Sequence, residues 1–257
     1  MKNITKYLNE TIQHPTDLDR EAVVVNNVLK HASEINQPNI EVEEGTEAIG
    51  NDYYNACRKI QTVKLPNSIK GIGDVAFGNC SALTSITIPS SVTSIGSAAF
   101  YGCSSLTEIV IPNSVTSIGP GAFAYCSSLK NIVIPNSVTQ IGYSAFGFCT
   151  SLTNIVIPNS VTSIGDKAFC CAPGRKLVIR NIRKLVTENE TTPVKNASSL
   201  TSVTLPESLT ELGKDVFLGC EKLETIYVPT TKADFYREHL PETLHDKIVE
   251  FELPNGD

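Results

Sequence analysis

Hydrophobic positions recur along this chain with a step of 23 residues. Superimposed copies give the pattern L-x-x-I-x-I-P-x-S-V-x-x-I-G-x-x-A-F-x-x-C, as in LTSITIPSSVTSIGSAAFYGC. Self-similarity at this period is typical of a solenoid or array, in which each repeat is one structural unit. Proline, phenylalanine and cysteine keep the step over five positions each, beginning at Pro66, Phe77 and Cys57.

One copy predicts three apolar faces. The Leu83–Ile88 segment alternates apolar and polar residues and predicts a short strand, which Pro89 ends because proline lacks an amide donor. Val92 and Ile95 supply a second inward-facing pair before a glycine bend. The face around Phe100 is expected on a short helical or 3₁₀ turn. One turn cannot bury three faces by itself, so turns should stack at strand spacing, about 4.8 Å.

The chain holds eight cysteines, and five of them recur beside the phenylalanine in the position of a small apolar residue. Free cysteine is often fully buried, so this pattern favours a stacked core column over disulfides. A zinc site would need paired ligands two to four residues apart, and the sequence has no C-x-x-C. Cys170 and Cys171 are adjacent, which leaves open a reactive pair or a displaced core cysteine.

These copies resemble the BspA-type class of leucine-rich repeats, because L-x-x-I-x-I is similar to the L-x-x-L-x-L of leucine-rich repeats generally. The resemblance covers roughly residues 40–229. It implies a leucine-rich repeat solenoid that is curved, with a parallel sheet on its inner face and a binding rather than catalytic role. Members of the family are often bacterial surface proteins that contact host or matrix components.

We expect a helical cap over residues 1–38, because Leu18, Ala22, Val25, Leu29 and Ala32 follow helical spacing. Solenoid ends need such covers, although a partner-binding helix is an alternative. Residues 39–229 should form about eight turns, with a worn first turn at residues 40–57 in which Tyr54 replaces phenylalanine.

The stretch 170–199 breaks the pattern. Leu152 and Leu177 are 25 residues apart, whereas Leu177 and Leu200 return to 23. Val194 and Ala197 fall in the phenylalanine and cysteine positions, so we interpret this stretch as an irregular turn within the stack.

Residues 230–257 are expected to form a short C-terminal cap. Thr231 could cap a helix that carries Phe235 and Tyr236 and ends before Pro241. The alternation over residues 248–253 predicts a final strand or an extended tail.

Composition narrows the class of partner. The 257 residues are 41% hydrophobic and 19% charged, which argues against disorder. No run of eighteen apolar residues occurs, so membrane insertion is not expected. The net charge of −6 disfavours nucleic acid as a default partner. The segment MKNITKYLNETIQHP lacks the apolar core of a secretory signal. It therefore predicts a cytoplasmic protein if Met1 is the native start, with the cell surface or secretion as the alternative.

Catalysis is not expected. Residues 75–165 contain only Glu108 and Lys130 as charged residues and no histidine, whereas catalytic sites need titratable groups near one another. There is no phosphate-binding glycine loop. An enzyme acting on carbohydrate would need paired carboxylates, which the repeats do not supply. The sequence accordingly predicts no cofactor and no metal.

The outward positions of the predicted strands are the first candidate binding site. The third and fifth positions of L-x-x-I-x-I point away from the core and should form one polar and one partly apolar stripe. The structural alternative is that the β-branched residues only stabilise neighbouring strands. The candidate residues are Ser85, Thr87, Glu108, Val110, Asn131, Val133, Asn154 and Val156.

A basic cluster in the irregular turn is the second candidate. Residues 166–200 carry seven basic and three acidic residues, whereas residues 201–257 carry five basic and twelve acidic ones. Loops that interrupt repeats often carry specificity, but such a cluster can also be a solvated face paired with an acidic neighbour. The residues of interest are Arg175, Arg180 and Arg183.

Together these features predict a non-catalytic protein-interaction scaffold that binds a protein or peptide on its parallel sheet. The alternative is an exported bacterial adhesin that binds host or matrix components.

Overall fold

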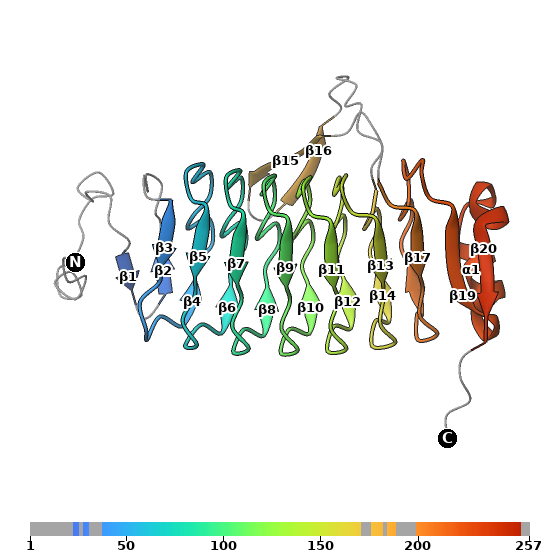
Figure 1. Ribbon diagram of the computed structural model, residues 1–257, viewed down its shortest axis with the longest axis horizontal. Helices are drawn as coiled ribbons and strands as arrows, with labels where there is room; N and C mark the ends of the chain where they lie inside the picture. The colour runs from blue at the N-terminus through green and yellow to red at the C-terminus, as the bar shows by residue number, and fades with distance from the viewer. Residues whose placement is uncertain are drawn as a thin grey trace.

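The computed structural model describes residues 38–170 and 199–252, together with the backbone of four further strands. These strands are β1 (Val23–Val25), β2 (Val28–Lys30), β15 (Lys176–Asn181) and β16 (Lys184–Glu188). Figure 1 shows the turns standing side by side in one row, with the N-terminus at one end and the C-terminus at the other. This architecture confirms the predicted leucine-rich repeat solenoid of about eight turns.

Each turn contributes one strand to a parallel sheet, which we call the long-strand sheet. Hydrogen bonds join its strands in the groups β3-β5-β7, β9-β11 and β13-β17-β19, and these groups lie next to one another. Paired residues hold equivalent repeat positions, as in Ile132 opposite Ile109. The strands are β3 (Asn39–Glu41), β5 (Thr62–Lys64), β7 (Ser85–Thr87), β9 (Glu108–Val110), β11 (Asn131–Val133), β13 (Asn154–Val156), β17 (Ser202–Thr204) and β19 (Thr225–Pro229).

A second parallel sheet, the short-strand sheet, is formed by the residues that precede the repeated glycine. The sequence predicted an inward-facing pair and a bend here, and the structure adds regular pairing between neighbouring turns. Its strands are β4 (Ala48–Ile49), β6 (Gly71–Ile72), β8 (Ser94–Ile95), β10 (Ser117–Ile118), β12 (Gln140–Ile141), β14 (Ser163–Ile164) and β18 (Glu211–Leu212).

The repeated glycine is required by close contact between turns. A Cβ atom placed on Gly119 would lie 2.8 Å from the backbone carbon and oxygen of Gly96. The same glycine in the next turn, Gly142, would meet the backbone nitrogen of Pro120 at 2.6 Å. Backbone atoms cannot move away cheaply, so any larger residue here would separate the turns.

The third side of each turn, which we call the Phe side, is built from hydrogen-bonded turns rather than the helical or 3₁₀ element that the sequence suggested. Two residues per turn have positive φ, for example Ala98 at 53° and Gly102 at 69°. This backbone directs alternate amides towards the following turn: Phe100 N–H donates to the carbonyl of Ala122 at 2.8 Å. The side is therefore held by bonds between turns.

The phenylalanines form one continuous column inside the Phe side. The rings of Phe100 and Phe123 are stacked with their centroids 5.4 Å apart and their planes within 3°. Tyr54 replaces phenylalanine in the first turn, as predicted, and stacks on Phe77 at 5.1 Å. The predicted stacking of identical side chains is thus confirmed.

The cysteines are buried beside this column, and those in the described residues are free thiols. The thiols of Cys80, Cys103, Cys126, Cys149 and Cys220 also donate hydrogen bonds that the sequence did not suggest. Cys126 Sγ lies 3.2 Å from the carbonyl oxygen of Phe100, and Cys103 Sγ lies 3.1 Å from that of Phe77. The cysteine therefore binds a carbonyl of the preceding turn as well as filling a small apolar space.

The C-terminal cap contains the predicted helix and strand. It consists of η3 (Thr230–Lys232), α1 (Ala233–His239), η4 (Glu242–Lys247) and β20 (Ile248–Phe251), and β20 pairs in parallel with β19. The predicted capping by Thr231 is wrong. No side chain caps α1, and the Thr231 hydroxyl donates to Glu207 Oε1 at 2.8 Å instead.

The prediction of an N-terminal helix is wrong for the part that the structure describes. Residues 23–25 and 28–30 form the antiparallel strands β1 and β2, and β2 extends the short-strand sheet at β4. Three consecutive valines favour a strand, and pairing with β4 satisfies that sheet edge. The remainder of residues 1–37 lies outside the described residues.

The interpretation of residues 170–199 as a turn of the stack is also wrong. Strand β13 pairs directly with β17, with Asn154 opposite Ser202, and β14 pairs directly with β18. The rings of Phe169 and Phe217 stack at 5.9 Å across the interruption. Strands β15 and β16 pair with each other as an antiparallel hairpin, so they need no place in the stack. Val194 and Ala197 lie outside the described residues.

Candidate interaction surface

The outward positions of the long-strand sheet are exposed, as the alternation of the strands predicted. In β9, Ile109 is buried at 5% exposure, whereas its neighbour Val110 is 76% exposed. The same exposed–buried–exposed pattern holds in β7, β11 and β13. All eight candidate residues on this face therefore present their side chains to solvent: Ser85, Thr87, Glu108, Val110, Asn131, Val133, Asn154 and Val156.

One line of outward positions is apolar over much of the sheet. Val133 lies opposite Val110 in the register, and both side chains are about three-quarters exposed. Towards the C-terminus, Tyr227 lies opposite Thr204, and Val249 of β20 lies opposite Tyr227. We call this line the apolar stripe. It consists of Val110, Val133, Val156, Tyr227 and Val249, with Thr204 between Val156 and Tyr227.

The apolar stripe gathers almost all large hydrophobic side chains that are exposed in the described residues. The described residues include six such side chains, of which five lie on the apolar stripe and only Leu218 lies elsewhere. Scattered apolar residues are normal on a protein surface, whereas here five of them follow one line of strand positions that only Thr204 interrupts. Val249 could not be predicted as part of this line, because the register of β20 against β19 does not follow from the repeat.

The neighbouring polar stripe is partly cross-linked by its own side chains. Ser202 Oγ donates to Asn154 Oδ1 at 2.8 Å, and Thr62 Oγ1 donates to Asn39 Oδ1 at 2.7 Å. Glu108 and Asn131 lie between these pairs and face each other in the register. Like Ser85 of β7, both side chains are exposed.

An ion pair lies on the same face beyond the N-terminal end of the apolar stripe. Lys64 Nζ lies 2.6 Å from Glu41 Oε1, and both side chains are mostly exposed. The hydrogen bond with Glu41 raises the pKa of Lys64, so the lysine stays charged. Because an exposed ion pair contributes little stability, its main consequence here is to make this end of the face hydrophilic.

The cysteine column is shielded from solvent in the folded protein. Burial raises the pKa of Cys80 to about 12 and raises those of Cys103 and Cys126 well above the usual value. The thiolate is the nucleophile and the metal-binding form, so these groups are poor candidates for either role. Cys170 is buried, and Cys171 lies outside the described residues.

The basic cluster is only partly described. Arg180 lies in β15, within the antiparallel hairpin, whereas Arg175 and Arg183 lie outside the described residues. Its role as a second binding site stays a prediction.

The described ranges hold neither a metal-ligand cluster nor a membrane-spanning helix. No group of three or more histidine, cysteine, aspartate or glutamate side chains there is arranged to hold a metal ion. Separately, none of the helices in those ranges has both the length and the apolar character needed to span a bilayer.

The stack of short parallel strands, with one exposed sheet along the whole row, defines a leucine-rich repeat solenoid. The chain belongs to the BspA-type leucine-rich repeat family. The model of this family, described as a BspA type leucine-rich repeat region of six copies, matches residues 30–133 and 116–240. No curated protein matches the sequence.

Several solved structures are similar. The T. pallidum leucine-rich repeat protein TpLRR shares 26% identity over 84% of this chain and 88% of its own, with a TM-score of 0.64. A leucine-rich cell surface protein from Faecalibacterium prausnitzii shares 21% identity over 88% and 89% of the two chains, with a TM-score of 0.44. The pneumococcal vaccine antigen PcpA shares 17% identity over 84% of this chain and 68% of its own, with a TM-score of 0.40.

Proposed function

We propose that this protein is an interaction scaffold that binds a protein or peptide along the apolar stripe of the long-strand sheet. The observation that carries the proposal is the concentration of exposed apolar side chains. Five of the six in the described residues lie on one line of equivalent strand positions. Burying this line against a partner would remove apolar surface from water, which is the main driving force for association.

The geometry indicates the size of the bound segment. The apolar stripe crosses the strands, and Val110 and Val249 are separated by five strand-to-strand steps, which is about 24 Å at usual strand spacing. An extended segment of about seven residues covers that length. Its apolar side chains would face the valines, and its polar groups would face Glu108 and Asn131.

The side chains beneath this surface are packed in the core whether or not a partner is bound. Beneath the valines, Ile109, Ile132 and Ile155 are buried and belong to the continuous core. A preorganised flat face loses little conformational entropy on binding, which favours affinity. This property suits a scaffold whose partner adapts to it.

The proposal is tested by placing charge on the stripe. Replacing Val110, Val133 and Val156 with lysine should abolish photo-crosslinking to a native partner from a probe placed at Glu108. A matched control carries Ser90→Lys, Asn113→Lys and Asn136→Lys, which add the same charge at exposed corners. It should retain crosslinking. Equal crosslinking by both variants would rule out the apolar stripe as the binding surface.

A second variant separates binding from strand stabilisation. Threonine keeps the β-branched shape of valine but removes apolar surface, so the Val110/Val133/Val156→Thr variant should unfold at nearly the wild-type urea concentration. Partner affinity should fall about tenfold or more. If stability falls and affinity does not, the valines serve the sheet and not a partner.

A further inference from the structure

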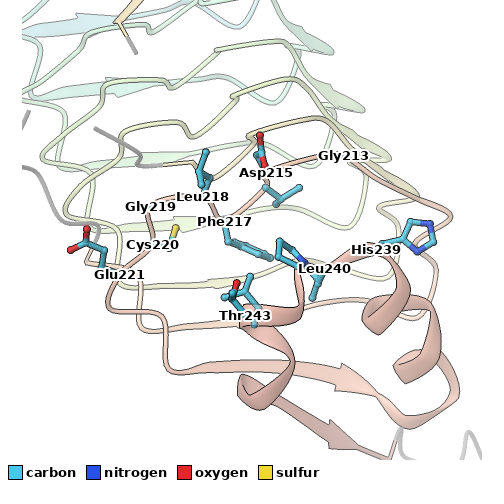
Figure 2. Close-up of a pocket in the computed structure, with 13 residues that line it drawn as sticks. Gly213, Asp215, Phe217, Leu218, Gly219, Cys220, Glu221, His239, Leu240 and Thr243 are labelled. Carbon is cyan, nitrogen blue, oxygen red and sulfur yellow. The ribbon is translucent and has the colours of Figure 1, made fainter. Parts of the chain in front are cut away.

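A pocket of about 200 Å³ lies at the C-terminal end of the Phe side, between the last regular turn and the cap. Figure 2 shows Phe217 and Leu240 close together at its centre. The last turn contributes residues 215–221, and the cap contributes Leu240, Pro241 and Leu244. The pocket occupies the position of the next phenylalanine and cysteine, because Phe217 stacks on Phe169 and the cap supplies no further ring to the column.

The pocket contains backbone amides that have lost their usual acceptors. In each earlier turn, the residues two and four positions after the repeated glycine donate to carbonyls of the next turn, at 2.7 to 3.0 Å. The equivalent amides after Gly213 belong to Asp215 and Phe217, and Gly219 holds the next such position. None of these three amides donates to an acceptor in the described part of the chain.

The cap satisfies the other edges of the last turn. The Tyr236 hydroxyl donates to the carbonyl of Pro206, and Lys232 Nζ donates to that of Leu209 at 3.2 Å. Lys247 Nζ donates to the carbonyl of Leu223 at 2.6 Å. The cap thus supplies side-chain donors to open acceptors, but its described residues, 230–252, accept no hydrogen bond from the amides of Asp215, Phe217 and Gly219.

These amides also form the positive end of an aligned array. The alternate amides of the Phe side that bond between turns all point along the stack towards the C-terminus, since each donates to the following turn. Aligned peptide dipoles leave partial positive charge at the end that exposes N–H groups, as at a helix N-terminus. The three amides belong to alternate residues, and two of these residues are left-handed, Asp215 at φ 56° and Gly219 at φ 78°. Backbone N–H groups that gather around left-handed residues form concavities that bind anions in other proteins.

We propose that this pocket binds a carboxylate with a short apolar tail. The carboxylate accepts hydrogen bonds from the amides of Phe217 and Gly219, and the tail packs among Phe217, Leu240 and Leu244. Phe217 is buried, at 4% exposure, so its unpaired amide gains most from an acceptor. The volume limits the tail to a few carbons. A free short-chain acid and the terminal carboxylate of a peptide share this chemistry.

Two acidic residues set the affinity. Figure 2 shows the carboxylates of Asp215 and Glu221 at the margins of the pocket, away from the Phe217–Leu240 pair. From the margins of the pocket, these carboxylates repel an anion through solvent without occupying the amides. We therefore expect weak binding, with a Kd on the order of 1 mM for a small probe.

The test is an amide-resolved NMR titration of the full chain with pentanoate, N-acetyl-leucine and pentanamide. Pentanoate or N-acetyl-leucine should cause saturable shifts of the Phe217 and Gly219 amides, and the tighter of the two identifies the source of the carboxylate. Pentanamide, which lacks the charge, should bind at least about fivefold more weakly. If neither acid shifts these amides at concentrations well above the millimolar range, water is their only partner and the proposal is wrong.

Two variants exclude non-specific effects. Leu244→Trp fills the pocket and should abolish the shifts, whereas the Phe123 amide should stay at its wild-type position and report an intact stack. Asp215→Asn changes only an exposed side chain, so it provides a test even if the first variant does not fold. It should strengthen pentanoate binding about threefold. Unchanged or weaker binding would contradict the proposed position of the carboxylate.

Discussion

The middle turns and the C-terminal end of this solenoid are built from the same motif but differ in the neighbours that each turn has. In the middle, Phe123 has a stacked ring on each face, and its amide donates to the carbonyl of Ala145. At the end, Phe217 has a stacked ring on one face, and its amide has no acceptor in the described residues. The difference shows that a repeat position obtains its stability from both neighbours.

The two regions also differ in how their apolar surface is used. The middle turns carry the three valines of the apolar stripe on a face that no other described element covers, whereas the end is covered by α1 and η4. The cap protects two sides and leaves a pocket on the third. Turns that share the same sequence motif therefore need not contribute equally to the stability of the stack.

Truncating the phenylalanine column should give the largest difference between the two regions. Phe123→Ala should lower the free energy of unfolding by about 4 kcal/mol, because it opens a cavity with packed walls on both sides. Phe217→Ala should cost about half as much, since a pocket already borders this ring. Urea denaturation followed by circular dichroism measures both. Equal losses would mean that the cap packs on Phe217 as well as a full turn does.

The glycine contact between turns should be nearly as sensitive. Gly119→Ala places a Cβ atom 2.8 Å from backbone atoms of Gly96 and should cost about 3 kcal/mol. Gly71→Ala is the matched control, because its Cβ atom would meet only the Ser94 hydroxyl at 3.5 Å. Its stability should change by less than about 1 kcal/mol. Similar effects at both positions would refute the contact as the reason for the glycine.

Alkaline pH should lower the stability of the folded protein, because it favours ionisation of the buried cysteine thiols. Burial raises the pKa of Cys80 from 9.0 to about 12, so its contribution to stability is complete below pH 9 and is lost as pH rises towards 12. At pH 10 this thiol should cost about 1 kcal/mol relative to pH 7. Cys80→Ala should reduce the difference between the two pH values. An unfolding midpoint equal at pH 7 and pH 10 would contradict the burial of the column.

Left-handed positions of the Phe side should give the smallest effect. Lys167 has φ 58°, which disfavours a side chain, so Lys167→Gly should raise stability by about 1 kcal/mol. Lys130 is exposed and is not among the left-handed residues, so Lys130→Gly should lower stability by about 0.5 kcal/mol. Thermal melts distinguish the two signs, and a loss at both positions would show that residue 167 is not strained.

Periodicity predicted most of the architecture because each position is repeated. The strands, the phenylalanine column and the outward side chains of β7 to β13 follow from alternation and from the 23-residue step. The short-strand sheet was not predicted, since two residues per turn give too little pattern to indicate a strand.

The parts that the sequence did not predict depend on pairing between distant segments. Nothing local shows that β13 joins β17 across 48 residues, or that β20 brings Val249 into the apolar stripe. Val25 of β1 and Leu29 of β2 fit the helical spacing as well as a strand, and pairing of β2 with β4 decides between the two. That the Phe217 amide has no acceptor among the described residues follows only once the end of the stack is known.

Amide hydrogen exchange along the Phe side tests the central claim most directly, namely that each turn is completed by the next. The amides of Tyr54, Phe77, Phe100, Phe123, Phe146 and Phe169 all donate to the following turn, and we expect each to exchange slowly in the unliganded protein. The amide of Phe217 should exchange much faster. Protection of Phe217 equal to that of Phe123, or rapid exchange throughout the column, would contradict this account.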